Sequence, residues 1–281
     1  QATASTYKKS GLLPFIILGL AGFNCVFQIL WFWPLVHRNI NFDAVSYIGI
    51  ARHILDGHLR QSLHGYWSPL ISWLIALIAI ACHDLTLAGR ITTILTFLLC
   101  LPLLYIFTFQ LWRSHRMAAL AVLWFTVAHD VTAFSVFFIG ADFIFTACVL
   151  AYFILLLRCL RHPSARHWLL LSLAHSIAFL AKAFAMPWLA VSTVIAAVLS
   201  SRNNLRKAVL HAALAAIFPM IVWMGWASAL HAKYGVFTAG YQSKWNLLDA
   251  RLRIRDQHAG LLLMFDTSHS SDEYQISATL F

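Results

Sequence analysis

The stretch Leu87–Trp112, LAGRITTILTFLLCLPLLYIFTFQLW, contains a single charged side chain, that of Arg90. As an α-helix it would be about 39 Å long, since each residue adds about 1.5 Å. The hydrocarbon core of a bilayer is about 30 Å thick. This segment therefore predicts a helix that crosses a membrane.

The rest of the chain has the same character. Its 281 residues are 61% hydrophobic and 11% charged, whereas a soluble domain has about a quarter charged residues. We therefore predict an all-α fold, a multi-pass transmembrane helical bundle. Together with Leu87–Trp112, six further apolar runs make seven expected spans: Leu12–Trp33, Met117–Ile139, Phe143–Leu157, Trp168–Leu180, Phe184–Leu199 and Ala208–Leu230.

The basic residues indicate how these spans are oriented. The net charge is +10, but it is concentrated in short loops between apolar runs, a pattern of membrane topology and not of nucleic-acid binding. Four basic loops all face the cytoplasm if the seven runs cross and Pro69–Cys82 does not. That segment is only about 21 Å long as a helix and is expected to be interfacial or re-entrant. The basic loops are Lys8-Lys9, Arg113–Arg116, Arg158–His167 and Ser201–Lys207.

This topology divides the chain into two parts. Residues 1–230 form the transmembrane module, with a first external loop at 37–84, and residues 231–281 form an external polar tail. The chain begins at Gln1 and stops at Phe281, so we expect it to be truncated.

The first external loop is predicted to carry amphipathic surface helices. After Asp43, the residues Tyr47, Ile50 and Ala51 share one face of a helix, and Gly57 would end it. Such a helix would lie flat on the membrane surface. Asp43 has two interpretations, which do not exclude each other: a helix N-cap that accepts a backbone hydrogen bond, or a general base.

Two further ionisable residues stand beside spans. Asp142 has no basic neighbour in the sequence and is either a solvated loop residue or a functional acid. Lys182 is either a lysine that snorkels to the interface or a cation held against a lipid phosphate. The topology puts both on the same face as Asp43, where two carboxylates could orient a hydroxyl group and take its proton.

The sequence gives no metal motif. The five cysteines lie in or beside apolar runs without CxxC spacing, and the histidines of the external loop have no HxxxH or HExxH spacing. A divalent metal is left open as a cofactor.

An ordered set of motifs resembles a known family. The chain is similar to the N-terminal half of bacterial GT-C glycosyltransferases related to protein O-mannosyltransferases and aminoarabinose transferases. The resemblance covers roughly Leu12 to Tyr241. It is carried by Asp43, Tyr47, Ala51, Asp56-Gly57, YWSPL at Tyr66–Leu70, LAGR at Leu87–Arg90, LWRSHRMAALAVL from Leu111, GAD at Gly140–Asp142 and FLAKAFAMPW at Phe179–Trp188.

The resemblance implies a function and a site. A sugar would pass, with inversion, from a polyprenyl-phosphate donor to a protein, lipid or glycan acceptor on the outer face of the bacterial inner membrane. It implies that Asp43 and Asp142 are the catalytic acids. The donor phosphate needs cations, for which Lys182, Arg52 and Arg90 are the candidates. The sugar or acceptor pocket is expected to include Tyr47, Tyr66 and Trp67.

The chain departs from the family pattern at two positions. The usual Lys-Pro-Pro reads Trp67-Ser68-Pro69 here, so the lysine that contacts phosphate is missing. The first acid is often followed by Glu in relatives, whereas here Ala44 follows Asp43.

Two alternatives belong to other functional classes. A transporter would explain the short, proline-interrupted spans around Lys182 and an acid, Asp130, inside a span, but the sequence has no inverted repeat. A truncated, inactive relative would serve as an interaction subunit.

Overall fold

In the computed structural model, residues 11–38, 40–201 and 204–240 are described, and they fold as a bundle of helices. The elements are α1 Leu13–Phe32, the 3₁₀ helix η1 Trp33–Arg38, α2 Phe42–Leu55, α3 Leu59–Ser62, α4 Pro69–Cys82, α5 Leu85–Trp112, α6 His115–Val127, α7 His129–Phe137, α8 Asp142–Arg161, α9 Ala165–Ala181, α10 Ala185–Ser200 and α11 Leu205–Tyr234. The all-α multi-pass class predicted from the sequence is confirmed.

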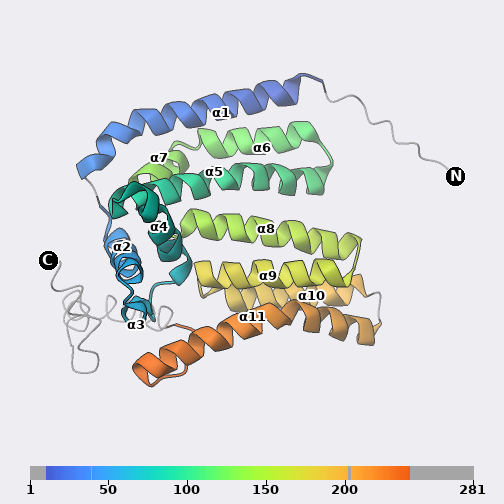
Figure 1. Cartoon of the computed structure of the whole chain (residues 1–281). Coiled ribbons are helices and arrows are strands. Elements are labelled where there is room, and N and C mark those ends of the chain that lie inside the picture. Colours follow the sequence, from blue (N-terminus) through green and yellow to red (C-terminus); the bar gives the residue numbers. More distant parts are fainter. Residues whose placement is uncertain (1–10, 39, 202–203, 241–281) are drawn as a thin grey trace, which may run out of the picture.

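The long helices form a layer in which neighbours run side by side. Contacts connect them in the order α1, α6, α5, α8, α9 and α11, and α10 packs against α8, α9 and α11. The short helices α2, α3, α4 and α7 all lie at one end of this layer (Figure 1). We call this end, with Asp43, Asp142 and Lys182, the site end. At the other end, five arginines lie in a loop or in the adjoining helix turns, and we call it the arginine end; they are Arg113, Arg116, Arg158, Arg161 and Arg166.

Helix length limits how many spans the described residues contain. Four helical segments are long and apolar enough to cross a membrane, namely Leu13–Val36, α5, α8 and α11. Helices α6 and α7, with a bend of 60° between them, form either a fifth, broken span or a re-entrant loop. Helices α9 and α10 have 17 and 16 residues, fewer than the roughly 20 that a span needs. The number of seven spans therefore stays a prediction, in which α9 and α10 would be the two shortest spans.

Local sequence explains where several helices begin and end. Asp84 begins α5 by accepting hydrogen bonds from the amides of Thr86 and Leu87 at 2.8 and 3.0 Å. Gly235, with φ of 72°, ends α11 in the left-handed conformation that glycine adopts easily. The segment Pro69–Cys82 forms α4 with the bounds expected from the sequence, and it lies across the site end in contact with α2, α5 and α9.

The core that supports the site end lies between α8, α9 and α10. Trp168 and Tyr152 are fully buried there. The Tyr152 hydroxyl lies 2.8 Å from the Leu189 carbonyl oxygen and 2.8 Å from the Thr193 hydroxyl. These contacts fix α8 against α10.

Candidate active site

Asp142 and Lys182 form an ion pair at the site end. Asp142 is the first residue of α8 and Lys182 follows the last residue of α9. Because these helices are antiparallel neighbours, the two residues meet although 40 positions separate them, with Lys182 Nζ 2.5 Å from Asp142 Oδ1. An acid at a helix N-terminus and a base at a C-terminus are also favoured by the helix dipoles. The basic partner that the local sequence of Asp142 lacks is therefore Lys182.

This ion pair is accessible and not buried. The Lys182 side chain is 24% exposed and the Asp142 side chain 51% exposed. The Lys182 ammonium also lies 5.8 Å from the centroid of the Phe145 ring, within the range of a cation–π contact. A surface pair of this kind contributes little to stability, so its partners can exchange for a charged ligand at low cost.

Asp43 lies within electrostatic range of this pair. It lies in the first turn of α2. The residue as a whole is exposed to solvent, but protein atoms surround part of its carboxyl group. Burial raises the pKa of Asp43, the charge of Asp142 raises it further, and the charge of Lys182 lowers it. The structure thus brings together the two acids and the cation that the sequence singled out.

The N-cap interpretation of Asp43 is wrong. Helix α2 begins at Phe42, so the cap position belongs to Asn41 and Asp43 is the second residue of the helix. The Asn41 amide does not cap either. Its nitrogen donates to the Ile139 carbonyl at 3.2 Å and its oxygen accepts from the Ile139 amide at 3.0 Å.

Asn41 is a positioning residue that sequence reasoning missed. Its paired hydrogen bonds fasten the start of α2 to Ile139, only three residues before Asp142. The side chain of Ile139 is packed closely as well, because a Cβ added at Gly89 of α5 would lie 2.9 Å from Ile139 Cδ1. The two acids are therefore carried by segments that are fixed to each other.

Three aromatic residues lie near the acids. Tyr47 follows Asp43 by one helical turn and is buried, with its ring 5.1 Å from that of Trp67, which in turn packs on Tyr66 at 4.6 Å. Burial raises the pKa of Tyr47, and the charges of Asp43, Asp142 and Tyr66 raise it further. Tyr47 therefore stays a neutral phenol in the range where the acids titrate.

The loop that carries Tyr66 and Trp67 is held by hydrogen bonds from several elements. The His64 ring nitrogen Nδ1 accepts from the amides of Tyr66 and Trp67 at 3.1 and 3.2 Å. At the end of α11, Lys233 donates to the Leu63 carbonyl at 2.7 Å. Sequence reasoning gave neither partner, and Lys233 in particular lies on a helix 170 positions from Leu63.

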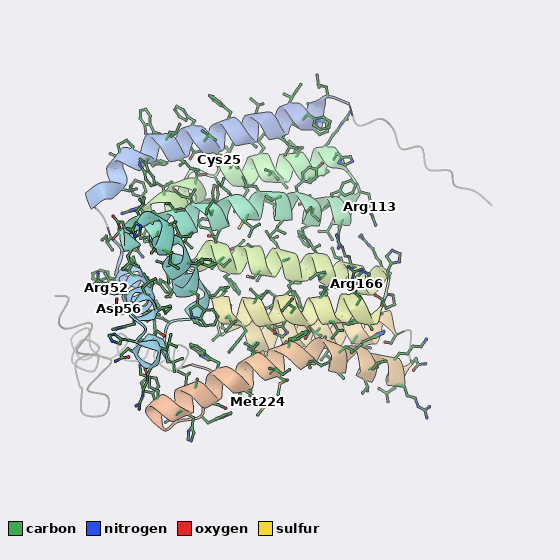
Figure 2. The ribbon with its side chains drawn as sticks, viewed as in Figure 1. Cys25, Arg52, Asp56, Arg113, Arg166 and Met224 are labelled. Atoms are coloured by element: carbon green, nitrogen blue, oxygen red, sulfur yellow. The ribbon has the colours of Figure 1, made fainter. Side chains whose placement is uncertain are left out.

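The structure places two predicted phosphate ligands away from this group. Arg90 is only 5% exposed and donates to the carbonyl oxygens of Val36 and Val136 at 2.6 and 3.1 Å. Arg52 is exposed and follows Asp43 by nine positions, which is two and a half helical turns and therefore the opposite face of α2. Figure 2 shows Arg52 at the site end near Asp56. We therefore withdraw both as ligands of a phosphate held by Lys182.

Metal ligands are not clustered in the described part of the chain. Within residues 11–38, 40–201 and 204–240, no group of three or more His, Cys, Asp or Glu side chains could hold a metal ion.

The fold and this group of residues define a class: a membrane helical bundle with two carboxylates and a cation at one end. A comparison with protein-family models supplies the family. Residues 66–226 match the model of the dolichyl-phosphate-mannose-protein mannosyltransferase family, which is more than half of the 281 residues. The chain belongs to this family of membrane glycosyltransferases. Searches of curated proteins and of solved structures found no match.

The matched region covers only part of the site. It includes Tyr66, Trp67, Asp142 and Lys182, whereas Asp43 and Asn41 precede it. Membership of a glycosyltransferase family supports the enzyme interpretation over the transporter alternative.

Proposed function

We propose that this protein transfers a sugar from a polyprenyl-phosphate donor to a hydroxyl group of an acceptor, at the site end of the bundle and on the external face of the membrane. The observation that carries the proposal is the accessible Asp142–Lys182 ion pair with Asp43 beside it. The acceptor is a protein, a lipid or a glycan. The name of the matched family supports a phosphate-linked sugar donor and a protein acceptor.

Lys182 is the residue we assign to the donor phosphate. Its ammonium is a mobile point charge with three donors, and among the described residues it contacts an accessible carboxylate and an aromatic ring. A phosphate that arrives along the membrane surface replaces Asp142 as its partner. Lys182 then stabilises the negative charge that develops on the phosphate as it leaves.

Asp43 is the residue we assign as the general base. It removes the proton of the acceptor hydroxyl, and the oxygen attacks the anomeric carbon of the sugar. The bond from that carbon to the phosphate oxygen breaks, and polyprenyl phosphate leaves with the electron pair. One direct displacement of this kind inverts the anomeric configuration.

The neighbours of Asp43 suit a base. A carboxyl of raised pKa holds a proton more strongly once it has taken it, which favours transfer at a pH near that pKa. When the phosphate occupies Lys182, Asp142 loses its cation and its charge acts more strongly on Asp43. Donor binding would therefore increase the basicity of Asp43.

The test is sugar transfer by the purified full-length protein from a panel of polyprenyl-phosphate sugars, with mannose first. Asp43→Asn keeps size and shape but cannot accept a proton, so we expect turnover to fall by about 10²–10⁴-fold. The matched control is Asp56→Asn, the same change on the exposed end of the same helix. It should retain normal turnover.

Donor binding is measured in parallel, because it separates chemistry from folding. Asp43→Asn should bind the donor as the unchanged protein does. Near-normal turnover by Asp43→Asn would move the base to another residue, and a protein without transfer from any donor in the panel would overturn the proposed activity.

A further inference from the structure

We propose a binding site for one anionic phospholipid in the groove between α5 and α6, with an acyl chain in the groove and the headgroup phosphate on Arg113 and Arg116. The headgroup position is beside Arg113 at the arginine end (Figure 2), while Asp43, Asp142 and Lys182 lie at the start of α2, the start of α8 and the end of α9, at the site end. It is therefore separate from the proposed sugar donor site, and it does not depend on the proposed function.

The groove has the dimensions and chemistry of an acyl-chain site. It encloses about 630 Å³ and is apolar at every lining position except Thr108. On α6 it runs from Met117 to Val127, which is about 15 Å at 1.5 Å per residue. One leaflet contributes half of the roughly 30 Å hydrocarbon core, also about 15 Å. A single leaflet's acyl chain therefore matches the groove in length.

The walls of the groove are partly or fully exposed apolar side chains at helical spacing. Leu104, Phe107 and Trp112 line it from α5, and Leu120, Trp124 and Val127 line it from α6. Trp124 is 80% exposed. In a protein that spans a membrane these side chains contact lipid. The groove gives one lipid acyl chain a defined position among them.

Two arginines are adjacent in the chain to residues that line the groove at the arginine end. Arg113 directly follows Trp112, and Arg116 directly precedes Met117, and both of these neighbours line the groove. Both arginines are exposed, and among the described residues their guanidinium groups have no carboxylate or carbonyl partner. Arg161 at the same end differs, because it donates to the Gln110 carbonyl.

This combination of charge and groove identifies the headgroup. A guanidinium binds phosphate through two parallel hydrogen bonds, and basic pockets beside membrane helices bind anionic headgroups. A zwitterionic headgroup offers the same phosphate but adds a cation that two arginines repel. The geometry thus favours a headgroup with net negative charge, such as phosphatidylglycerol.

Lipid retention by the full-length protein tests the site. The protein is purified in detergent, and native mass spectrometry counts bound phosphatidylglycerol or phosphatidylcholine with the same acyl chains. We expect one phosphatidylglycerol to be retained more strongly than phosphatidylcholine. Arg113→Gln with Arg116→Gln should weaken its retention by about 25-fold, since each basic residue contributes about a factor of five.

The matched control is Arg158→Gln with Arg166→Gln, which removes the same charge from exposed positions at the end of α8 and the start of α9. It should bind phosphatidylglycerol as the unchanged protein does. Equal loss in both double variants would overturn the site, because it would reduce the effect to net charge. Equal retention of the two lipids by the unchanged protein would also overturn it.

Two further measurements separate a lipid from a free anion. Ala121→Phe fills the groove from its α6 wall and should weaken retention of both lipids while the arginines stay in place. Inorganic phosphate in millimolar excess should not displace the lipid. Unchanged retention by Ala121→Phe, or displacement by phosphate, would show that no acyl chain occupies the groove and would overturn the proposal.

Discussion

At the scale of single residues, the chemistry of the site depends on opposing charges around one carboxyl. Asp142 raises the pKa of Asp43 and Lys182 lowers it, in addition to the effect of burial. A general base must be deprotonated to act, so activity should be present above this pKa and lost as the pH falls through it. The acidic limb of the rate profile therefore reports the surroundings of Asp43.

Two substitutions should move that limb in opposite directions. Asp142→Asn removes a negative charge, so the pKa of Asp43 falls and the limb moves to lower pH. Lys182→Met removes the positive charge, so the pKa rises and the limb moves to higher pH. Shifts of about one unit are expected for charges at this range. The measurement is kcat/KM against pH, which reports the free enzyme.

Asp56→Asn is the control for these profiles. It removes a carboxyl from the end of the same helix, whereas the charges that shift the pKa of Asp43 are those of Asp142 and Lys182. Its profile should superimpose on that of the unchanged protein. Two shifts in the same direction would mean that the limb belongs to a group other than Asp43.

At the scale of elements, Asn41 joins two helices that each carry an acid. Its two hydrogen bonds to the Ile139 backbone are partly buried, and a hydrogen bond of this kind contributes about 1 kcal/mol. Asn41→Ala should therefore destabilise the protein by about 1–2 kcal/mol and lower kcat, because Asp43 and Asp142 lose their fixed separation. Unfolding by denaturant and turnover at saturating donor measure the two effects.

Asn204→Ala provides a matched control. Asn204 is also the residue before a helix, and its side chain accepts a hydrogen bond from the Lys207 amide at 3.1 Å. It lies on a loop of the arginine end and contacts no site residue. Its loss should lower stability while kcat stays normal, and a normal kcat in Asn41→Ala would remove the positioning role.

The elements themselves could be predicted largely from the sequence. The signals are local: apolar runs correspond to helices, and helix ends occur at the capping residue Asp84 and at Gly57 and Gly235. The bounds of Pro69–Cys82 agree as well. The bend of 60° between α6 and α7 was missed, because the run Met117–Ile139 reads as one span although His129 and Asp130 interrupt it.

The site could be predicted only in part, because its contacts are long-range. Periodicity and topology placed Asp43, Asp142 and Lys182 at one end, but the ion pair depends on how α8 packs against α9. The carbonyl partners of Arg90 depend on η1 and α7 in the same way. Arg52 could have been excluded from the sequence alone, by its nine-residue distance from Asp43.

At the scale of the whole molecule, charge separates the two ends of the bundle. Arginines lie in or within one helical turn of the connections from α5 to α6 and from α8 to α9, and Figure 2 shows Arg113 and Arg166 at the same end. Arg52 and Asp56 lie at the opposite end. Loops rich in arginine and lysine stay in the cytoplasm, so we expect the site end to face outward.

Labelling of single cysteines tests this orientation in intact cells. Four of the native cysteines are buried and Cys82 is partly exposed, so a Cys82→Ala background has little reactivity of its own. A cysteine at Gln61, on the site end, should react with a membrane-impermeant maleimide. Cysteines at Ser114 and Pro163, on the arginine end, should react only after the membrane is opened.

The two arginine-end positions together test the span count between them. Ser114 and Pro163 are separated by α6, α7 and α8, so they lie on the same side only if the bent pair α6 and α7 crosses as one span and α8 returns. If they label on opposite sides, α6 with α7 is a re-entrant segment, and Asp142 and Asp43 can no longer share a face of the membrane. If Gln61, Ser114 and Pro163 all react from outside, the arginine end is not cytoplasmic, and the orientation inferred from the basic residues is wrong. The expected pattern, with Gln61 outside and Ser114 and Pro163 inside, requires both the single bent span and the outward-facing site.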